Sequence, residues 1–235
     1  MNYFIYDDIN SSDFNVFISG ESTYSTPERD IELIAIKGRN GTLSIDNGRF
    51  ANINISYPAF IVHDFRNNFD AVKAALLSKK GYKKLSDTYD QDHYRLARYY
   101  SGIDPQMDQL NRHGTFDIIF DCDPRRFLKS GDRVLTFTSA GSVKNPTRFK
   151  ALPLIRAYGT GSFSINGVSV HISSLTSLGY TDIDCETQEA YAGTNSRNSV
   201  ITLANGEFPA LVSGINSIVK SGITKLEMRP RWWTI

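Results

Sequence analysis

Apolar and polar residues alternate with a period of two along most of the chain. Such alternation, rich in β-branched and aromatic residues and interrupted by Gly, Asn, Asp and Pro, is typical of β-strands with one buried face. In the first part of the chain it predicts strands at Val16–Ser19, Ile31–Lys37, Thr42–Ile45, Ala51–Tyr57, Tyr94–Tyr100, Thr115–Asp121 and Arg133–Thr138. In the later part it predicts strands at Leu154–Tyr158, Ser162–Ile165, Val168–Ile172, Thr181–Cys185, Ser199–Leu203 and Thr224–Met228. The pattern therefore predicts a mainly β protein.

Two Asn-Gly pairs lie between neighbouring predicted strands, at Asn40-Gly41 and Asn166-Gly167. Asn and Gly accept the positive φ angles that a two-residue type I′ turn requires. Each pair therefore predicts an antiparallel hairpin.

One segment breaks the β pattern. Phe69, Val72 and Leu76 recur at helical spacing, Asn68 can cap the helix start and Gly81 can end it. We expect a helix of about three turns that packs on a sheet.

Small residues followed by Pro146 occupy 139–145 and predict a linker between two domains. We place the first domain at 1–140, as a β-sandwich or split barrel with one helix. The second domain, 141–235, is expected to be a β-sandwich.

The composition is balanced: 40% of the residues are hydrophobic, and 26 Lys and Arg face 25 Asp and Glu, a net charge of +1. This excludes a polyionic nucleic-acid grip and a highly charged disordered tail. The N-terminal sequence lacks the pattern of a signal peptide, and no apolar run approaches the ~18–20 residues of a membrane span. We expect a soluble protein.

The two cysteines, Cys122 and Cys185, lie beside acidic residues. A chain of this length does not need disulfides, so two cysteines favour a reducing compartment. Neighbouring carboxylates raise the pKa of a thiol, which argues against a nucleophilic role.

Three carboxylates alternate along one predicted strand, at Asp182, Asp184 and Glu186. On a strand they share one face. One interpretation is the acid and base of a β-sandwich glycosidase, with crowding raising one pKa. The other is the solvated face of a strand whose Ile183 and Cys185 point inward.

A second evenly spaced set, Asp117, Asp121 and Asp123, favours a solvated strand face over a cation site, because it lacks the loop of an EF-hand. The four histidines are widely separated and carry no zinc signature. We predict no cofactor, no metal and no catalytic residue. Aromatic residues make up 12% of the chain, and we expect them either to fill the core or to stack on sugars. Trp232 and Trp233 are adjacent, so on a strand their side chains would face opposite sides.

Three stretches of the chain resemble one family, the phage distal tail proteins (Dit) of long-tailed siphophages. The N-terminal stretch is Ser25-Thr26-Pro27-Glu28-Arg29-Asp30-Ile31-Glu32 with Ile36-Lys37-Gly38-Arg39-Asn40-Gly41. The middle stretch is Asn145-Pro146-Thr147, Pro153-Leu154-Ile155 and Tyr158-Gly159-Thr160-Gly161. The last stretch is Asp182-Ile183-Asp184-Cys185-Glu186, Ala190-Tyr191, Phe208-Pro209-Ala210-Leu211, Gly214-Ile215-Asn216-Ser217-Ile218 and Pro230-Arg231-Trp232-Trp233. The chain departs from the family at Ser213-Gly214, where Pro-Gly is expected.

The resemblance implies a structural hub without enzymatic activity. It implies a tail-tube-like N-terminal domain that forms a hexameric ring, and a galectin-like C-terminal β-sandwich. The ring would join the tail tube to the baseplate or tail fibre, in the virion, after assembly in the host cytoplasm. The tape-measure protein, the tail-associated lysin or fibre and the receptor-binding protein would be neighbours, and DNA would pass through without specific binding.

On this resemblance, eight residues are expected at subunit or partner contacts. They are Arg29, Glu32, Arg39, Asn40, Phe208, Asn216, Arg231 and Trp232. Two alternative functions stay open. One is a carbohydrate-binding adhesion module, and the other is a glycosidase that uses Asp182 and Glu186.

Overall fold

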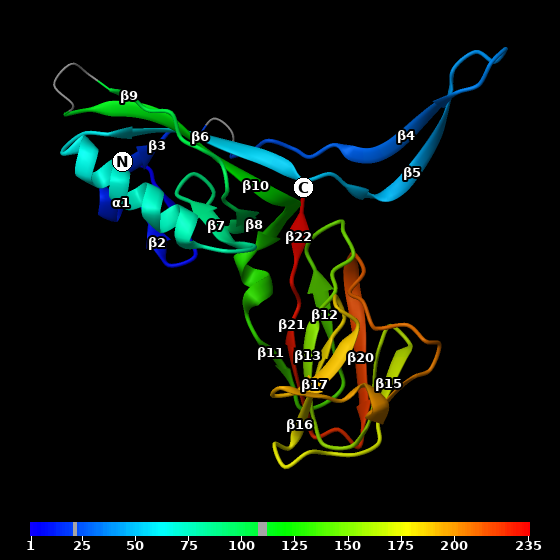
Figure 1. The fold of residues 1–235 in the computed structure, drawn as a ribbon. Coiled ribbons are helices and arrows are strands. Elements are labelled where there is room, and N and C mark those ends of the chain that lie inside the picture. The colour runs from blue at the N-terminus through cyan, green and yellow to red at the C-terminus, as the bar shows by residue number, and fades with distance from the viewer. Residues whose placement is uncertain (21–22, 108–111) are drawn as a thin grey trace. The chain divides into compact units, whose positions relative to one another are not determined.

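The computed structural model describes residues 1–20, 23–107 and 112–235, and their contacts divide the chain into two compact units (Figure 1). The first unit comprises residues 1–126 with residue 235, and the second comprises residues 127–234. Strands dominate both units, and α1 (Phe65–Ser78) is the one α-helix in the described ranges. The predicted mainly β fold is confirmed.

One large sheet forms the framework of the first unit, with strands in the order β2-β1-β7-β8-β10-β6-β3 and β9 beside β10. Its long central pair is antiparallel and runs from Gly114 opposite Ile61 to Cys122 opposite Ile53. The 3-10 turn η1 spans Ser11–Phe14. The strands are β1 (Phe4–Tyr6), β2 (Ile9–Asn10), β3 (Val16–Ile18), β6 (Ile53–Ile61), β7 (Lys83–Asp87), β8 (His93–Arg98), β9 (Gln106–Met107) and β10 (Gly114–Leu128).

Helix α1 buries the predicted apolar face against this sheet, with Phe69, Val72 and Leu76 in the core. The predicted cap at Asn68 is wrong, because the helix begins one turn earlier, at Phe65. The ring of Phe65 stacks on that of Phe69 at a centroid distance of 5.2 Å, which extends the apolar stripe by one turn. Within the described ranges, no helix has both the length and the apolarity needed to cross a membrane.

A separate two-stranded sheet, which we call the arm, is formed by β4 (Arg29–Ala35) and β5 (Thr42–Phe50). It is visible in Figure 1 as a long ribbon. The predicted hairpin is confirmed, but its type I′ turn is not. The loop spans 36–41, and positive φ angles occur at Gly38 and Gly41 instead of at Asn40 and Gly41.

Two antiparallel sheets enclose the core of the second unit as a β-sandwich, which confirms the predicted class for this part of the chain. The first, which we call the outer sheet, has the order β11 (Leu135–Phe137), β21 (Lys225–Arg229), β13 (Leu154–Tyr158), β16 (Tyr180–Asp184), β17 (Glu189–Ala192) and β18 (Asn195–Ser196). The second sheet has the order β12 (Gly141–Asn145), β20 (Gly214–Ser221), β14 (Gly161–Ile165), β15 (Val168–Ile172) and β19 (Ile201–Leu203). Shorter elements are η2 (Lys129–Asp132), η3 (Asn198–Val200) and β22 (Trp233–Thr234).

The Asn166-Gly167 turn joins β14 to β15 as predicted. Both residues have positive φ, 51° and 85°, and Ile165 pairs directly with Val168. This is the two-residue type I′ geometry, because both central residues are left-handed.

The expected linker at 139–145 is not irregular backbone, since it contains β12, which pairs with β20. The side-chain amide of Asn145, at the end of β12, donates to the carbonyls of Phe149 and Leu211. Small residues did not exclude a strand here because Val143 and Asn145 supply its inward face. The predicted domain limits, 1–140 and 141–235, stay a proposal about units that fold independently.

Candidate functional site

The arm carries exposed apolar side chains on both of its faces. Ile31 and Leu33 lie on one face of β4, and Ile34 lies on the other, directly opposite Leu43 of β5. Leu33 is 65% exposed. Six large apolar residues in this region are exposed, namely Ile31, Leu33, Ile34, Ile36, Leu43 and Ile45, whereas Phe50 at the end of β5 is half-buried. Such a patch on a two-stranded sheet without its own core is typical of a surface that another protein covers.

Ion pairs hold the base of the arm together. Arg29 contacts Asp46 at 2.9 Å, and Arg49 contacts Asp30 at 2.6 Å. The hydrogen bond from Arg49 lowers the pKa of Asp30. These pairs are exposed, so they fix the register of β4 against β5 more than they stabilise the fold.

A buried polar network anchors the chain segment that leads into the arm. The carboxylate of Asp87 accepts hydrogen bonds from the hydroxyls of Tyr57 at 2.6 Å and Thr23 at 3.2 Å. The buried guanidinium of Arg95 donates to the backbone carbonyl of Ser25 at 3.0 Å. We call these residues the root network. It fixes the point from which the arm leaves the large sheet.

Four of the expected contact residues belong to the arm. Arg29 and Glu32 lie on β4, and Arg39 and Asn40 lie in the loop at its tip. All four are exposed. The structure thus places these four residues on the arm, next to its exposed apolar side chains. The apolar side chains were not among the contact residues expected from the sequence. The part of the four residues in subunit contacts stays a prediction.

The other four expected contact residues belong to the second unit. Asn216 is fully buried, and its side chain bonds the backbone N–H and C=O of Val212. Trp232 lies in the core, and the partly buried side chain of Phe208 packs against this core. Arg231, which lies between β21 and β22, binds the carboxylate of Asp184 at the end of β16. The part of these four residues in an interface stays a prediction. Because Asn216 and Trp232 are buried, they would affect an interface only by stabilising the fold of this unit.

Two arginines bind the carboxylates that suggested a glycosidase. Arg156 holds Asp182 through two hydrogen bonds of 2.7 and 2.8 Å. Arg231 holds Asp184 in the same bidentate way, at 2.7 and 2.8 Å, and lies 3.4 Å from Glu186. Asp182 and Asp184 are buried beneath these arginines, so the strand face is not the solvated face of the sequence interpretation.

The electrostatics of Asp184 oppose a general-acid role. Burial alone would raise its pKa, but the bond from Arg231 and the backbone N–H of Glu186 outweigh burial and lower the pKa. A glycosidase acid needs a raised pKa. Asp184 therefore does not fit a general acid, and Asp182 is held in a bidentate ion pair by Arg156.

The second carboxylate set is also held by arginines. Asp121 pairs with Arg98, and Asp123 pairs with Arg125 at 2.8 Å. Asp117 is exposed on β10. Over residues 1–20, 23–107 and 112–235, no cluster of three His, Cys, Asp or Glu side chains is arranged to hold a metal ion.

Both cysteines are buried, and burial raises the pKa of each thiol to about 12. We therefore expect neither Cys122 nor Cys185 to react with iodoacetamide at pH 8 while the protein is folded, because the thiolate is the nucleophile. Mass spectrometry after brief labelling measures this. Labelling in guanidinium chloride is the control and should modify both, whereas rapid modification of either in the native protein would contradict the prediction.

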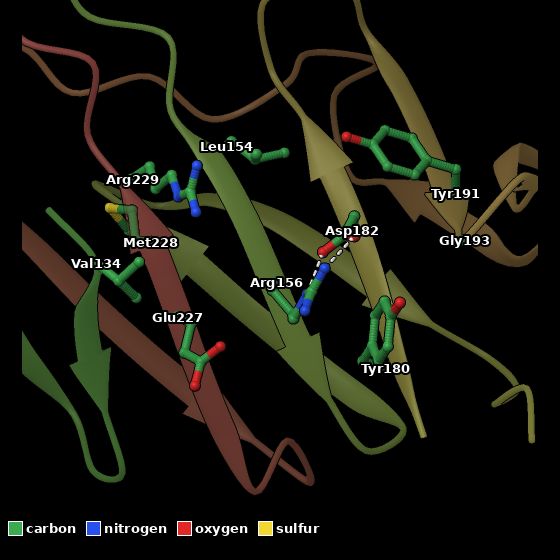
Figure 2. Close-up of a pocket in the computed structure, with 10 residues that line it drawn as sticks. All are labelled: Val134, Leu154, Arg156, Tyr180, Asp182, Tyr191, Gly193, Glu227, Met228 and Arg229. Carbon is green, nitrogen blue, oxygen red and sulfur yellow. Dashed lines mark hydrogen bonds and ion pairs between the residues drawn. The ribbon is translucent and has the colours of Figure 1, made fainter. Parts of the chain in front are cut away.

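A hollow of about 380 Å³ lies on the face of the outer sheet that points away from the core (Figure 2). The Arg156–Asp182 pair lies at its centre, between β13 and β16. The ring of Tyr180 packs against the Arg156 guanidinium at 4.0 Å. The lining residues are Val134, Leu154, Arg156, Tyr180, Asp182, Tyr191, Gly193, Glu227, Met228 and Arg229. Of this set, the sequence indicated only Asp182 as a candidate functional residue, because the residues converge through strand pairing.

No protein-family model and no curated protein matches the sequence. Solved structures do match, and the chain shares their fold. The chain is similar to the Dit protein of phage SPP1, a paradigm of the hub adsorption apparatus in phages that infect Gram-positive bacteria. The TM-score is 0.75 at 12% identity, over 97% of this chain and 98% of that one. Two structures of the phage P2 baseplate in its activated conformation, with Ca and with Sr, each match with a TM-score of 0.53 at 8% identity, over 97% of both chains.

Proposed function

We propose that this protein is the distal tail hub of a long-tailed phage, in which six copies close into a ring that joins the tail tube to the baseplate or tail fibre. The observation that carries the proposal is the arm, whose apolar side chains are exposed on both faces in a single chain. The fold shared with the SPP1 hub protein over nearly the whole chain supports it.

A second copy of the chain is the occupant that we propose for the arm. An isolated two-stranded hairpin is at best marginally stable in water, so an arm with six exposed large apolar residues gains most by packing on another subunit. Identical chains that each donate an arm to the next form a symmetric assembly. In such an assembly the exposed charges of Arg29, Glu32 and Arg39 would set the register between subunits.

The charge balance supports a channel through which DNA passes without being held. Each Lys or Arg that neutralises a phosphate strengthens DNA binding through counterion release. A chain with a net charge of +1 contributes little such retention. The ring would transmit DNA without reading its sequence.

The proposed partners follow from the hub position. They are the tail tube protein, the tape-measure protein, the tail-associated lysin or fibre and the receptor-binding protein, all within the virion. The role needs no catalytic step, and the carboxylates of Asp182 and Asp184, which suggested catalysis, are neutralised by Arg156 and Arg231.

Light-scattering mass and negative-stain imaging of the purified protein test the ring. Six copies of the 26.4 kDa chain give about 158 kDa, and we expect six-fold particles with a central hole. The variant Leu33→Glu should abolish the ring and leave the fold of the chain intact, because residue 33 is 65% exposed in the single chain.

The matched control is Ile215→Glu, which places the same charge at a residue that is 75% exposed but lies in the second unit. It should keep the ring. A 26 kDa monomer for the unmodified protein would overturn the ring, and a ring that survives Leu33→Glu would show that the arm is not the contact.

A further inference from the structure

Three polar groups at the hollow on the outer sheet have no partner among the described residues. They are the hydroxyls of Tyr180 and Tyr191 and the guanidinium of Arg229. In Figure 2 the Tyr191 side chain lies on the far side of β16 from β13, with its hydroxyl directed toward β16. Groups of this kind on converging strands are available to bind a polar ligand.

The pairs at the centre of the hollow also retain hydrogen-bonding capacity. Arg156 has five N–H donors, and its bonds to Asp182 use two of them. Each oxygen of Glu227 accepts one bond, from Lys225 or from the Tyr158 hydroxyl, and can accept another. The surface therefore offers donors and acceptors within one small area.

The charges that line the hollow cancel. Arg156 and Arg229 are balanced by Asp182 and Glu227. A phosphate or another anion would meet two carboxylates, whereas a neutral ligand meets no net charge. The volume of about 380 Å³ is at the lower end of the range for small-molecule pockets, about 300–1,000 Å³.

We propose that this hollow binds a neutral saccharide. A sugar presents hydroxyls that both donate and accept, which match Arg156, Glu227 and Tyr191. Its apolar ring face can pack on the half-buried ring of Tyr180, which the Arg156 contact holds in place. Because the site has binding groups and no free general acid, it binds without hydrolysis.

The tryptophans do not provide an alternative platform. Trp232 is 5% exposed in the core. Trp233 stacks on Phe149 at a centroid distance of 4.3 Å, and its indole N–H donates to the carbonyl of Lys150. The residues that would bind the ligand therefore surround the hollow on the outer sheet, and binding there does not depend on ring formation.

Saturation-transfer difference NMR of the full chain tests the proposal, because it detects ligand protons whether the protein is a single chain or a ring. The probes are methyl glycosides of glucose, galactose, rhamnose and N-acetylglucosamine, with inorganic phosphate as a competitor. We expect at least one glycoside to receive saturation from the unmodified protein, and phosphate not to displace it.

Two variants preserve the ion pair at the centre and remove groups that the ligand would use. Tyr191→Phe and Glu227→Gln should each raise the dissociation constant of the bound glycoside about tenfold, the effect of one lost hydrogen bond. Tyr100→Phe, at a 66% exposed tyrosine of the first unit, is the matched control and should leave the constant unchanged.

Three results would overturn the proposal. They are no saturation transfer to any of the four glycosides, equal binding by Tyr191→Phe, Glu227→Gln and the unmodified protein, or displacement of the glycoside by phosphate. The last would identify an anion site. Thermal unfolding of each variant, compared with the unmodified protein, confirms that a loss of binding is not a loss of fold.

Discussion

Replacing Arg231 with alanine is expected to destabilise the second unit by about 3–5 kcal/mol, because it leaves a buried carboxylate without its partner. The side chain of Asp184 is 10% exposed, and Arg231 binds both of its oxygens. The backbone N–H of Glu186 would remain as a donor at 3.0 Å but carries no full charge.

The same substitution should reverse the pH dependence that Asp184 contributes. In the folded protein its pKa is lowered, so the stability it contributes is present above the unfolded pKa of about 3.9 and is lost as the pH falls through the folded value. Without Arg231, burial raises the pKa above the unfolded value. The stability difference between variant and unmodified protein should then shrink as the pH falls through the raised pKa of the variant and on below about 4.

Denaturant unfolding followed by tryptophan fluorescence measures the stability of the second unit, in which Arg231 lies. Both tryptophans, Trp232 and Trp233, belong to the second unit. Arg229→Ala is the control, because that exposed arginine has no partner among the described residues. Equal midpoints for the two variants, or a difference that does not change with pH, would refute the assignment.

Asp87→Ala is expected to lower the free energy of unfolding of the first unit by about 2–4 kcal/mol. Asp87 accepts bonds from the buried hydroxyls of Tyr57 and Thr23 and from the backbone N–H groups of Tyr89 and Asp90. Alanine leaves the two hydroxyls without this acceptor in a buried site. The chain at Thr23 also loses its attachment to β7, so the root of the arm should become more mobile.

Hydrogen exchange measured peptide by peptide separates the two consequences of Asp87→Ala. Peptides that cover Thr23 and Ser25 should exchange faster than expected from the global loss of stability. Asp92→Ala removes an exposed aspartate with no partner among the described residues and serves as the control. Unchanged protection at Thr23 would mean that the root network does not anchor the arm.

Local patterns predicted the elements whose signals are contained in a few adjacent residues. Asn166-Gly167 predicted its turn because both residues of the loop tolerate positive φ. At the arm the same dipeptide failed as a two-residue turn, because Gly38 takes up a positive φ two residues earlier and the loop widens. The helix face at Phe69 and Val72 followed from its spacing, whereas its start did not.

Features that depend on strand pairing could not be predicted from local patterns. Arg156 lies 26 residues from Asp182, and only the register of β13 against β16 makes them neighbours. The strand β20 (Gly214–Ser221) was missed although Asn216 and Ile218 alternate inward, because a buried asparagine reads as a turn residue until its backbone partners are known.

The arm was predicted as a hairpin but not as an exposed one. Its sequence Ile31-Glu32-Leu33-Ile34-Ala35-Ile36 places apolar residues on both faces, a pattern that a doubly buried strand also produces. The sequence of the arm does not indicate whether other parts of the protein cover its two faces. The structure leaves both faces uncovered by the described part of the chain.

An arm that belongs to one chain and packs on a different surface of the next makes a heterologous contact. Such contacts close into a ring only when the rotation between neighbours divides a full turn, and otherwise they propagate as an open helix. In the proposed hub, the bonds of Thr23 and Ser25 would help to set the angle at which the chain leaves the large sheet. Six-fold closure would then depend on a few buried hydrogen bonds far from the contact itself, and loosening them would turn a closed ring into a polymer of undefined length.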